Sequence, residues 1–314
     1  MADKSHKQYQ ETPVTSSQVL SRSLVAPAIP FLLNTVATRY RLMFTFRRAG
    51  ELSLLLPSFP ATFAMDSSDI PYQPASFQSM EMVHKIMAAA LLDFANSSFD
   101  DFKLLTGDER WNMMSRCHMA LIMADGCFRT QRLQPGRTDY ERCYAGVNCY
   151  FSREGLPGFF ADAPAPDRHK DAVSIMCRRF ETMRGTIFPH YLSLQLSERE
   201  YHALIVLIFC SFDMDSSDAV AAFSSKHRSR VLFELQRYFR DEGIFSDEES
   251  AVRICRLLQL VCAFKEAAHE IVRDFEIYRL LDIMNDETIV VQVCGATRSS
   301  NALEGASRPL DISS

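Results

Sequence analysis

Apolar residues recur with the period of an α-helix through most of the chain. In its first half, the clearest apolar face is formed by Met80, Val83, Met87, Ala90, Leu91 and Phe94. Steps of three, four and seven residues place these side chains on one side of a helix. A weaker helical pattern covers residues 31–48. Between the two, residues 50–76 contain four prolines and Gly50, and they predict a connecting loop.

Three capping boxes predict where later helices begin. They are Thr106-x-x-Glu109, Ser197-x-x-Glu200 and Ser246-x-x-Glu249. In such a box the hydroxyl accepts a hydrogen bond from the amide three residues later, and the carboxylate accepts one from the amide of the first residue. Another helix is expected to start at Ser216 or Ser217. The last helix is predicted to be the longest, and its apolar pattern decays after Asn285.

Residues 134–167 break the helical pattern with many glycines and prolines, whereas the chain from Asp171 onward is helical almost continuously. Two short β-capable segments, 148–151 and 158–160, predict a small hairpin. No repeat of about 20–50 residues is present, which disfavours a solenoid. We predict a single all-α domain over residues 31–290 with eight to ten helices and one β-hairpin. A disordered segment, 1–30, is expected to precede it and a flexible tail, 291–314, to follow it.

Charge and cysteine spacing exclude several kinds of site. The net charge is −5, and no cluster of Lys and Arg offers a phosphate-binding surface, so we expect no direct contact with nucleic acid. None of the nine cysteines forms a C-x-x-C pair, which argues against a structural zinc site and favours reduced thiols in an intracellular protein. Prolines interrupt the apolar run 23–37, which is shorter than the ~20 apolar residues of a membrane span. We expect no metal, no cofactor and no membrane partner.

Residue-level support for catalysis is absent. The chain has no phosphate-binding glycine loop, no nucleophile elbow and no H-E-x-x-H pair. Cys117 and His118 are adjacent, so on a helix they point about 100° apart and cannot act as a nucleophile and its base. We therefore predict that the protein is not an enzyme. The 23 phenylalanines and 14 methionines suit an adaptable apolar cavity, or they simply fill the core.

The segment from Leu92 to Met114 resembles the signature of nuclear receptor ligand-binding domains. That signature begins with an aromatic-Ala pair. It continues with a Phe and a Leu in the turn, then an Asp-Gln pair, then two large apolar residues. Here the matching residues are Phe94-Ala95, Phe102, Leu105, Asp108-Glu109 and Met113-Met114. The sequence departs from the pattern by one extra residue between the two phenylalanines and by Glu in place of Gln.

Three further stretches are similar to helices of this family, and they occur in the family's order. Residues 33–48 resemble the first helix of the nematode-type receptors, 194–201 the eighth helix and 252–260 the tenth. The resemblance implies an antiparallel helical sandwich around a buried apolar pocket, which takes a lipophilic ligand or is filled by side chains. It places the pocket lining at Met80, Val83, Met87, Leu91, Met119, Ile122, Met123, Tyr150 and Phe151, although each of these residues could be ordinary core.

The resemblance also implies an ion pair and a surface for coregulator proteins. Glu200 and Arg253 stand where the family has a buried ion pair, although Glu200 could also complete the capping box with Ser197. The family's coregulator clamp uses a Lys after the aromatic-Ala pair, and this chain has Asn96 there, so Lys103 and Arg116 are the nearest replacements. The clamp's second residue is a Glu in a terminal apolar-apolar-x-Glu-apolar-apolar helix. Only partial copies occur, at 283–286 and 310–312.

The family usually carries eight zinc-binding cysteines ahead of this domain, and residues 1–79 contain none. We therefore expect a regulator of transcription without its own DNA-binding module, which acts through coregulators or a receptor homo- or heterodimer along residues 246–284. Its expected location is the nucleus, with the cytoplasm as a second site. The alternative is a helical interaction scaffold with no small-molecule ligand, and a thiol enzyme is a weaker third hypothesis.

Overall fold

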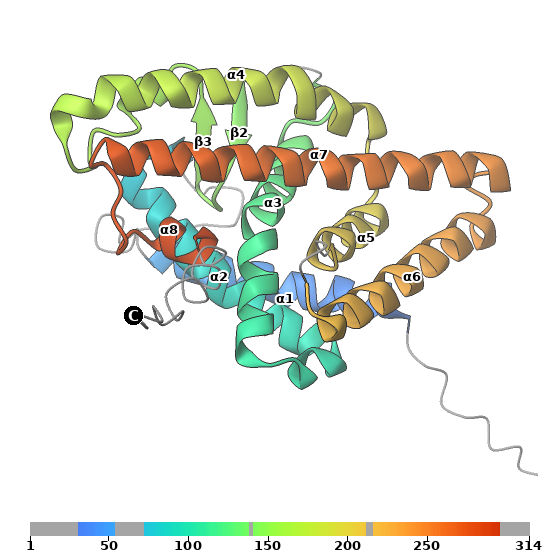
Figure 1. The fold of residues 1–314 in the computed structure, drawn as a ribbon. Coiled ribbons are helices and arrows are strands. Elements are labelled where there is room, and N and C mark those ends of the chain that lie inside the picture. The colour runs from blue at the N-terminus through green and yellow to red at the C-terminus, as the bar shows by residue number, and fades with distance from the viewer. Residues whose placement is uncertain (1–30, 54–71, 138–140, 212–215, 296–314) are drawn as a thin grey trace, which may run out of the picture. The chain divides into compact units, whose positions relative to one another are not determined.

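The computed structural model describes residues 31–53, 72–137, 141–211 and 216–295, and Phe31 begins its compact unit (Figure 1). The expected disordered segment 1–30 lies outside the described residues. The all-α prediction is confirmed. In chain order the α-helices are α1 (Leu32–Ser53), α2 (Phe77–Ser98), α3 (Gly107–Leu133), α4 (His169–Leu194), α5 (Glu198–Phe209), α6 (Asp218–Asp241), α7 (Asp247–Leu280) and α8 (Ile289–Cys294). Three short 3-10 helices join them, η3 (Asp100–Leu104), η4 (Leu156–Gly158) and η5 (Pro166–Arg168).

Side-chain caps set the starts of four helices as the sequence predicts. The capping boxes at Thr106, Ser197 and Ser246 all form at the starts of α3, α5 and α7. The Ser217 hydroxyl accepts a hydrogen bond from the Val220 amide and begins α6. A fourth capping box was not predicted, because it pairs Ser76 with Ser79 instead of with an acidic residue. At the other end of the first loop, α1 continues to Ser53 and so includes four residues of the range predicted as loop, and 54–71 lie outside the described residues.

The helices form three layers (Figure 1). The middle layer consists of α3 and α5, and every residue of α5 from Glu200 to Phe209 is buried. On one side α1 packs on α2 and α5, and α2 packs on α3. On the other side α4 and α7 run next to each other and pack on α3. This arrangement follows from the apolar patterns, because α5 is apolar all round from Ala203 to Phe209, whereas the outer helices have one apolar face.

A small three-stranded sheet replaces the predicted two-stranded hairpin. Strand β3 (Cys149–Ser152) pairs antiparallel with β2 (Arg142–Tyr144) and parallel with β1 (Gln73–Pro74). The hairpin prediction is confirmed for β3 but wrong for residues 158–160, because Gly158 ends η4 and residues 159–160 form a turn after it. Pro157 in η4 has no amide to donate to a β-ladder, and Phe159 and Phe160 are instead buried in the core.

Helix α8 crosses residue 291, the predicted start of the tail. It runs to Cys294 and packs on α2 and α3, with Val290, Val293 and Cys294 buried. The remainder of the predicted tail, 296–314, lies outside the described residues. Helix α8 therefore extends the packed part of the chain beyond the last apolar pattern that the sequence makes obvious.

A buried polar network joins α1, α3 and α5 at the centre of the molecule. Asp125 on α3 accepts hydrogen bonds from Arg47 Nη1 at 2.7 Å and from the Tyr40 hydroxyl at 2.6 Å, both on α1. The Tyr201 hydroxyl on α5 donates to the same carboxylate at 3.2 Å. Arg129 Nε adds a second cationic partner at 3.0 Å. These cations hold the pKa of Asp125 far below its usual range against the opposing effect of burial.

Candidate functional site

An apolar cavity of about 170 Å³ lies between α2, α3, α4, α7 and the sheet. Its wall contains six methionines and seven phenylalanines, and the polar groups on it are few. The apolar residues of the wall are Phe77, Met80, Met119, Ile122, Met123, Cys143, Ala145, Phe151, Leu156, Phe159, Phe160, Met176, Phe180, Met183, Phe188, Ile271, Phe275, Met284 and Val290. Such a lining suits an apolar molecule, because its burial removes apolar surface from water.

Five of the nine residues expected in the lining are in the cavity wall, namely Met80, Met119, Ile122, Met123 and Phe151. The other four lie elsewhere. Val83, Met87 and Leu91 are buried in the core further along α2. Tyr150 alternates with Phe151 along β3, so it points to the other face of the sheet, where Arg142 stacks over its ring at 4.6 Å.

Helices α4 and α7 supply a part of the wall that was not predicted from the sequence. Met176, Phe180 and Met183 follow one another at helical spacing on α4, and Phe275 and Tyr278 face them from α7. The spacing on α4 is a signal that could have been found. It identifies an apolar face, however, and only the tertiary packing decides that this face meets a cavity instead of another helix.

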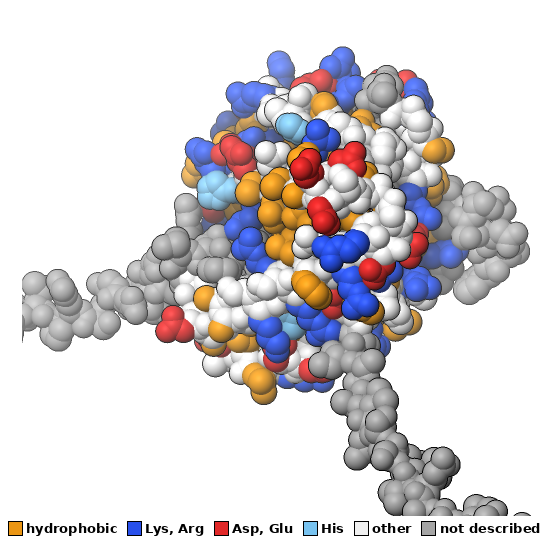
Figure 2. Space-filling model, turned by 90° about the vertical axis from the view of Figure 1, so that its right-hand side faces the viewer, with side chains coloured by type: hydrophobic (Ala, Val, Ile, Leu, Met, Phe, Trp, Pro, Cys, Tyr) orange, Lys and Arg blue, Asp and Glu red, His pale blue; other side chains and the backbone are white. Residues whose placement is uncertain are grey.

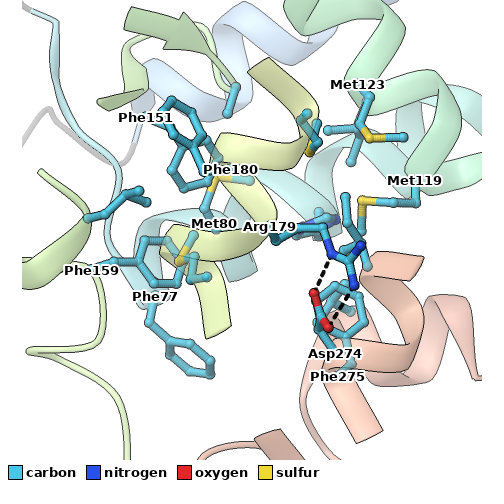
Figure 3. Close-up of a pocket in the computed structure, with 18 of the residues that line it drawn as sticks. Phe77, Met80, Met119, Met123, Phe151, Phe159, Arg179, Phe180, Asp274 and Phe275 are labelled. Atoms are coloured by element: carbon cyan, nitrogen blue, oxygen red, sulfur yellow. Dashed lines mark hydrogen bonds and ion pairs between the residues drawn. The ribbon is translucent and has the colours of Figure 1, made fainter. Parts of the chain in front are cut away.

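One ion pair lies in the cavity wall and joins α4 to α7 (Figure 3). Arg179 donates from Nε to Asp274 Oδ2 at 2.7 Å and from Nη2 to Asp274 Oδ1 at 3.0 Å. Nη2 also contacts the Glu270 carboxylate at 3.2 Å. The side chains of Arg179 and Asp274 are 23% and 10% exposed, so the pair is largely shielded from water. The two-point contact holds the guanidinium in a fixed orientation.

Two histidines meet beside the cavity. His84 on α2 lines the cavity. Its Nδ1 atom lies 3.1 Å from Nε2 of His118 on α3. Burial, followed by the charge of Arg47, lowers the pKa of His84 to about 4. Burial and the neighbouring His84 lower the pKa of His118 well below its ordinary value. Both rings are therefore neutral near pH 7, and one donates a hydrogen bond to the other.

Glu81 connects the cavity wall to α8, the last described helix. Its carboxylate, on α2, accepts a hydrogen bond from the Ile289 amide at 2.7 Å and a longer one from the Val290 amide at 3.5 Å. Burial raises the pKa of Glu81, and these two hydrogen bonds oppose that rise. The sequence of α8, from Ile289 to Cys294, follows the apolar-apolar-x-Glu-apolar-apolar pattern with the exposed Gln292 at the Glu position. This helix escaped prediction because the family's Glu is absent from it.

The two residues proposed to bind coregulators lie on successive elements between α2 and the middle of α3. Lys103 is exposed on η3, beside Leu104, whose side chain is 84% exposed. Arg116 is half-buried on α3. Their binding of a coregulator stays a prediction.

The structure brings Glu200 and Arg253 together, as the resemblance implies. Arg253 Nε on α7 lies 2.5 Å from Glu200 Oε1 on α5, and Arg253 Nη2 donates to the Leu194 carbonyl at 2.5 Å. The other Glu200 oxygen, Oε2, accepts from the Ser197 amide at 2.9 Å. The capping box and the ion pair therefore use different oxygens of one carboxylate.

The buried cysteines have the opposite character from a thiol nucleophile. Burial raises the pKa of both Cys143 and Cys149 to about 11 and that of Cys294 to about 12, whereas a reactive thiol needs a lowered pKa. Within the described ranges, no group of three His, Cys, Asp or Glu side chains could hold a metal ion. None of the described helices is long and apolar enough to cross a membrane.

Comparison with known proteins agrees with this architecture. Residues 71–281 match the family model for the ligand-binding domain of nuclear hormone receptor. Among solved structures, the ultraspiracle ligand-binding domain from Drosophila melanogaster is similar, with a TM-score of 0.54 and 13% sequence identity over 84% of this chain and 96% of that chain. A comparison with curated protein sequences found no significant match. The prediction of an antiparallel helical sandwich of the receptor type is confirmed, and this chain belongs to the family of nuclear hormone receptor ligand-binding domains.

Proposed function

We propose that this chain binds a small lipophilic ligand in the cavity and regulates transcription through protein partners. The observation that carries the proposal is the apolar cavity of about 170 Å³ between α2, α3, α4 and α7, with a single ion pair in its wall. Each methylene of a ligand buried there contributes about 0.8 kcal/mol, so few polar contacts are needed. The family supports a ligand-binding domain in transcription regulation.

The cavity can adapt its volume to a ligand. Pockets for drug-sized ligands span roughly 300–1,000 Å³, so this cavity suits a smaller molecule in its present form. Methionine side chains rotate about three bonds and fill irregular gaps, and six of them line this wall. Their rearrangement would allow a larger ligand to enter without a change in the helices.

Coregulator binding near η3 and α8 is the second part of the proposal. Lys103 and Arg116 would grip the carboxyl end of a partner helix through its dipole, and the half-buried Ile289 and Val291 of α8 would face that helix. The family resemblance also suggests a receptor dimer along α7 and a nuclear location. It further suggests that the chain belongs to the nematode-type branch. The absence of catalysis and the domain boundaries at 31 and 290 stay predictions.

A helical interaction scaffold without a ligand is the second candidate function, and the surface favours it in one respect. In Figure 2 hydrophobic side chains form a group that charged side chains surround. The corner where α6 joins α7 lies on this side of the molecule and exposes Ile244 at 43% and Val252 at 53%. Contiguous exposed apolar surface is typical of protein interaction sites.

Native mass spectrometry of the purified protein, followed by extraction, distinguishes the two candidates. We expect a small lipophilic molecule that dissociates on denaturation. The variant Met119→Trp should lose it, because the indole fills the cavity, whereas Leu104→Trp on the exposed surface of η3 should retain it. A protein that is empty and takes up no apolar dye in either form would contradict ligand binding and leave the scaffold as the better explanation.

A further inference from the structure

The cavity wall includes one charged hydrogen-bond donor, Arg179, that is only partly used. Arg179 commits Nε and Nη2 to Asp274 and Glu270. Within the described part of the chain, no residue accepts a hydrogen bond from the remaining nitrogen, Nη1. In the view of Figure 3 the guanidinium lies between Asp274 and the side chain of Met119, another residue of the cavity wall. Because the salt bridge fixes the plane of the guanidinium, Nη1 is oriented before a ligand arrives.

The charges around Arg179 select the kind of acceptor. Asp274 and Glu270 already surround this guanidinium with two carboxylates, and Glu81 contributes another to the cavity wall. A ligand carboxylate would add a fourth negative charge in a shielded place, and the one cation is already neutralised. A ligand ammonium would instead face the guanidinium itself. A neutral oxygen avoids both penalties and still accepts a hydrogen bond from a charged donor.

The rest of the cavity determines the body of the ligand. In Figure 3 the rings of Phe77, Phe151, Phe159 and Phe180 lie away from the ion pair, toward the other end of the cavity. Aromatic side chains favour offset and edge-on contacts with another ring. An engineered protein cavity of about 150 Å³ holds a benzene molecule, so a cavity of similar size suits one or two fused rings.

We propose that the pocket takes a neutral one- or two-ring hydrocarbon that carries a single carbonyl or hydroxyl oxygen, and that Arg179 Nη1 donates the hydrogen bond to this oxygen. The proposal rests on the ligand-binding function proposed above and adds the chemical class of the ligand. Met119 and Met123 on α3 would close over the ring system near the oxygen.

The test compares four compounds that share one skeleton: tetralin, 1-tetralone, 1-aminotetralin and tetralin-1-carboxylate. Their dissociation constants are measured on the whole chain by ligand-observed NMR. We expect 1-tetralone to bind about tenfold more tightly than tetralin, and more tightly than the amine and the carboxylate. Equal affinity of tetralone and tetralin, or tightest binding of either charged compound, overturns the inference and leaves ligand binding intact. Binding by none of the four overturns both.

A double variant assigns the preference to Arg179. Replacing Arg179 by Met alone would leave Asp274 buried and unpaired, so Arg179→Met is combined with Asp274→Leu, which removes both charges together. We expect the ratio of the tetralin and tetralone dissociation constants to fall from about ten to about one. The matched control is Arg178→Met, at the exposed neighbouring position on α4, and the ratio should stay near ten. A ratio that persists in the double variant contradicts the role of Arg179.

Discussion

Arg47 on α1 and Asp125 on α3 form an ion pair in the interior, with Nη1 and Oδ2 2.7 Å apart and neither side chain more than 3% exposed. Glu51, one turn further along α1, contacts the same guanidinium and also accepts a hydrogen bond from the Val147 amide beside the sheet. Two charges that are both removed from water require each other, because either one alone would keep its full desolvation penalty. The pair therefore holds α1 against α3 mainly because separating the two charges would leave each one buried and unpaired, and less because of their net attraction.

Removal of one partner should reveal that cost. We predict that Asp125→Ala lowers the free energy of unfolding by about 3–5 kcal/mol, because Arg47 stays buried without its main counter-charge. Urea denaturation followed by circular dichroism measures the change. The matched control is Asp241→Ala, which breaks the exposed pair with Arg237 on α6 and should cost at most about 1 kcal/mol. Similar losses in the two variants would contradict a structural role for the buried pair.

Because of its buried histidines, we predict that the protein loses stability as the pH falls from 6.5 to 4. Burial is the main cause that lowers the pKa of His84 and that of His202 to about 4 each. In the unfolded chain both imidazoles take up protons below about pH 6.5. The unfolded state therefore binds more protons across this window, and stability falls as the pH falls. His202→Gln should make the dependence of melting temperature on pH shallower, with the exposed His190→Gln as control. An unchanged slope in His202→Gln would remove this histidine from the explanation.

Helix starts could be predicted from the sequence because the chemistry is local. A hydroxyl and a carboxylate three residues apart are sufficient to cap α3, α5 and α7 wherever these helices pack. The cavity was predicted less completely. Met80 and Val83 belong to one apolar face of α2, but only Met80 reaches the cavity. Periodicity identifies the buried side of a helix. Tertiary packing decides which residues on that side line the cavity and which ones contact other side chains.

Helix α8 shows the other limit, since its start depends on a residue far away in the sequence. Thr288 makes no side-chain capping bond, and Glu81, 208 residues earlier, accepts the hydrogen bond from the Ile289 amide instead. A six-residue helix also offers too little sequence for a periodic pattern to stand out. Arg179 and Asp274 escaped prediction for the same reason, because their pairing joins residues 95 positions apart.

The pair of Glu200 and Arg253 allows the capping role of the carboxylate to be separated from its charge. We predict that Arg253→Ala lowers the free energy of unfolding by about 3 kcal/mol or more, because the buried Glu200 loses its counter-charge. Glu200→Gln should also destabilise the protein, although a glutamine can still complete the capping box with Ser197. Thermal and urea denaturation measure both variants. Normal stability of Glu200→Gln would mean that the carboxylate acts as a cap alone.

Glu81 should control how firmly α8 is held. Its carboxylate supplies acceptors for the first amides of α8, at Ile289 and Val290, and no nearer side chain caps them. We predict that Glu81→Ala accelerates amide hydrogen exchange across α8 by about fivefold or more, the equivalent of about 1 kcal/mol for a lost cap, while α5 keeps its protection. Glu81→Gln should give an intermediate rate because its amide oxygen still accepts one hydrogen bond. Lys85→Ala, one turn along α2 and exposed, is the matched control. Uniform acceleration in all helices would indicate global destabilisation, and unchanged exchange in α8 would show that its packing on α2 and α3 is sufficient without Glu81.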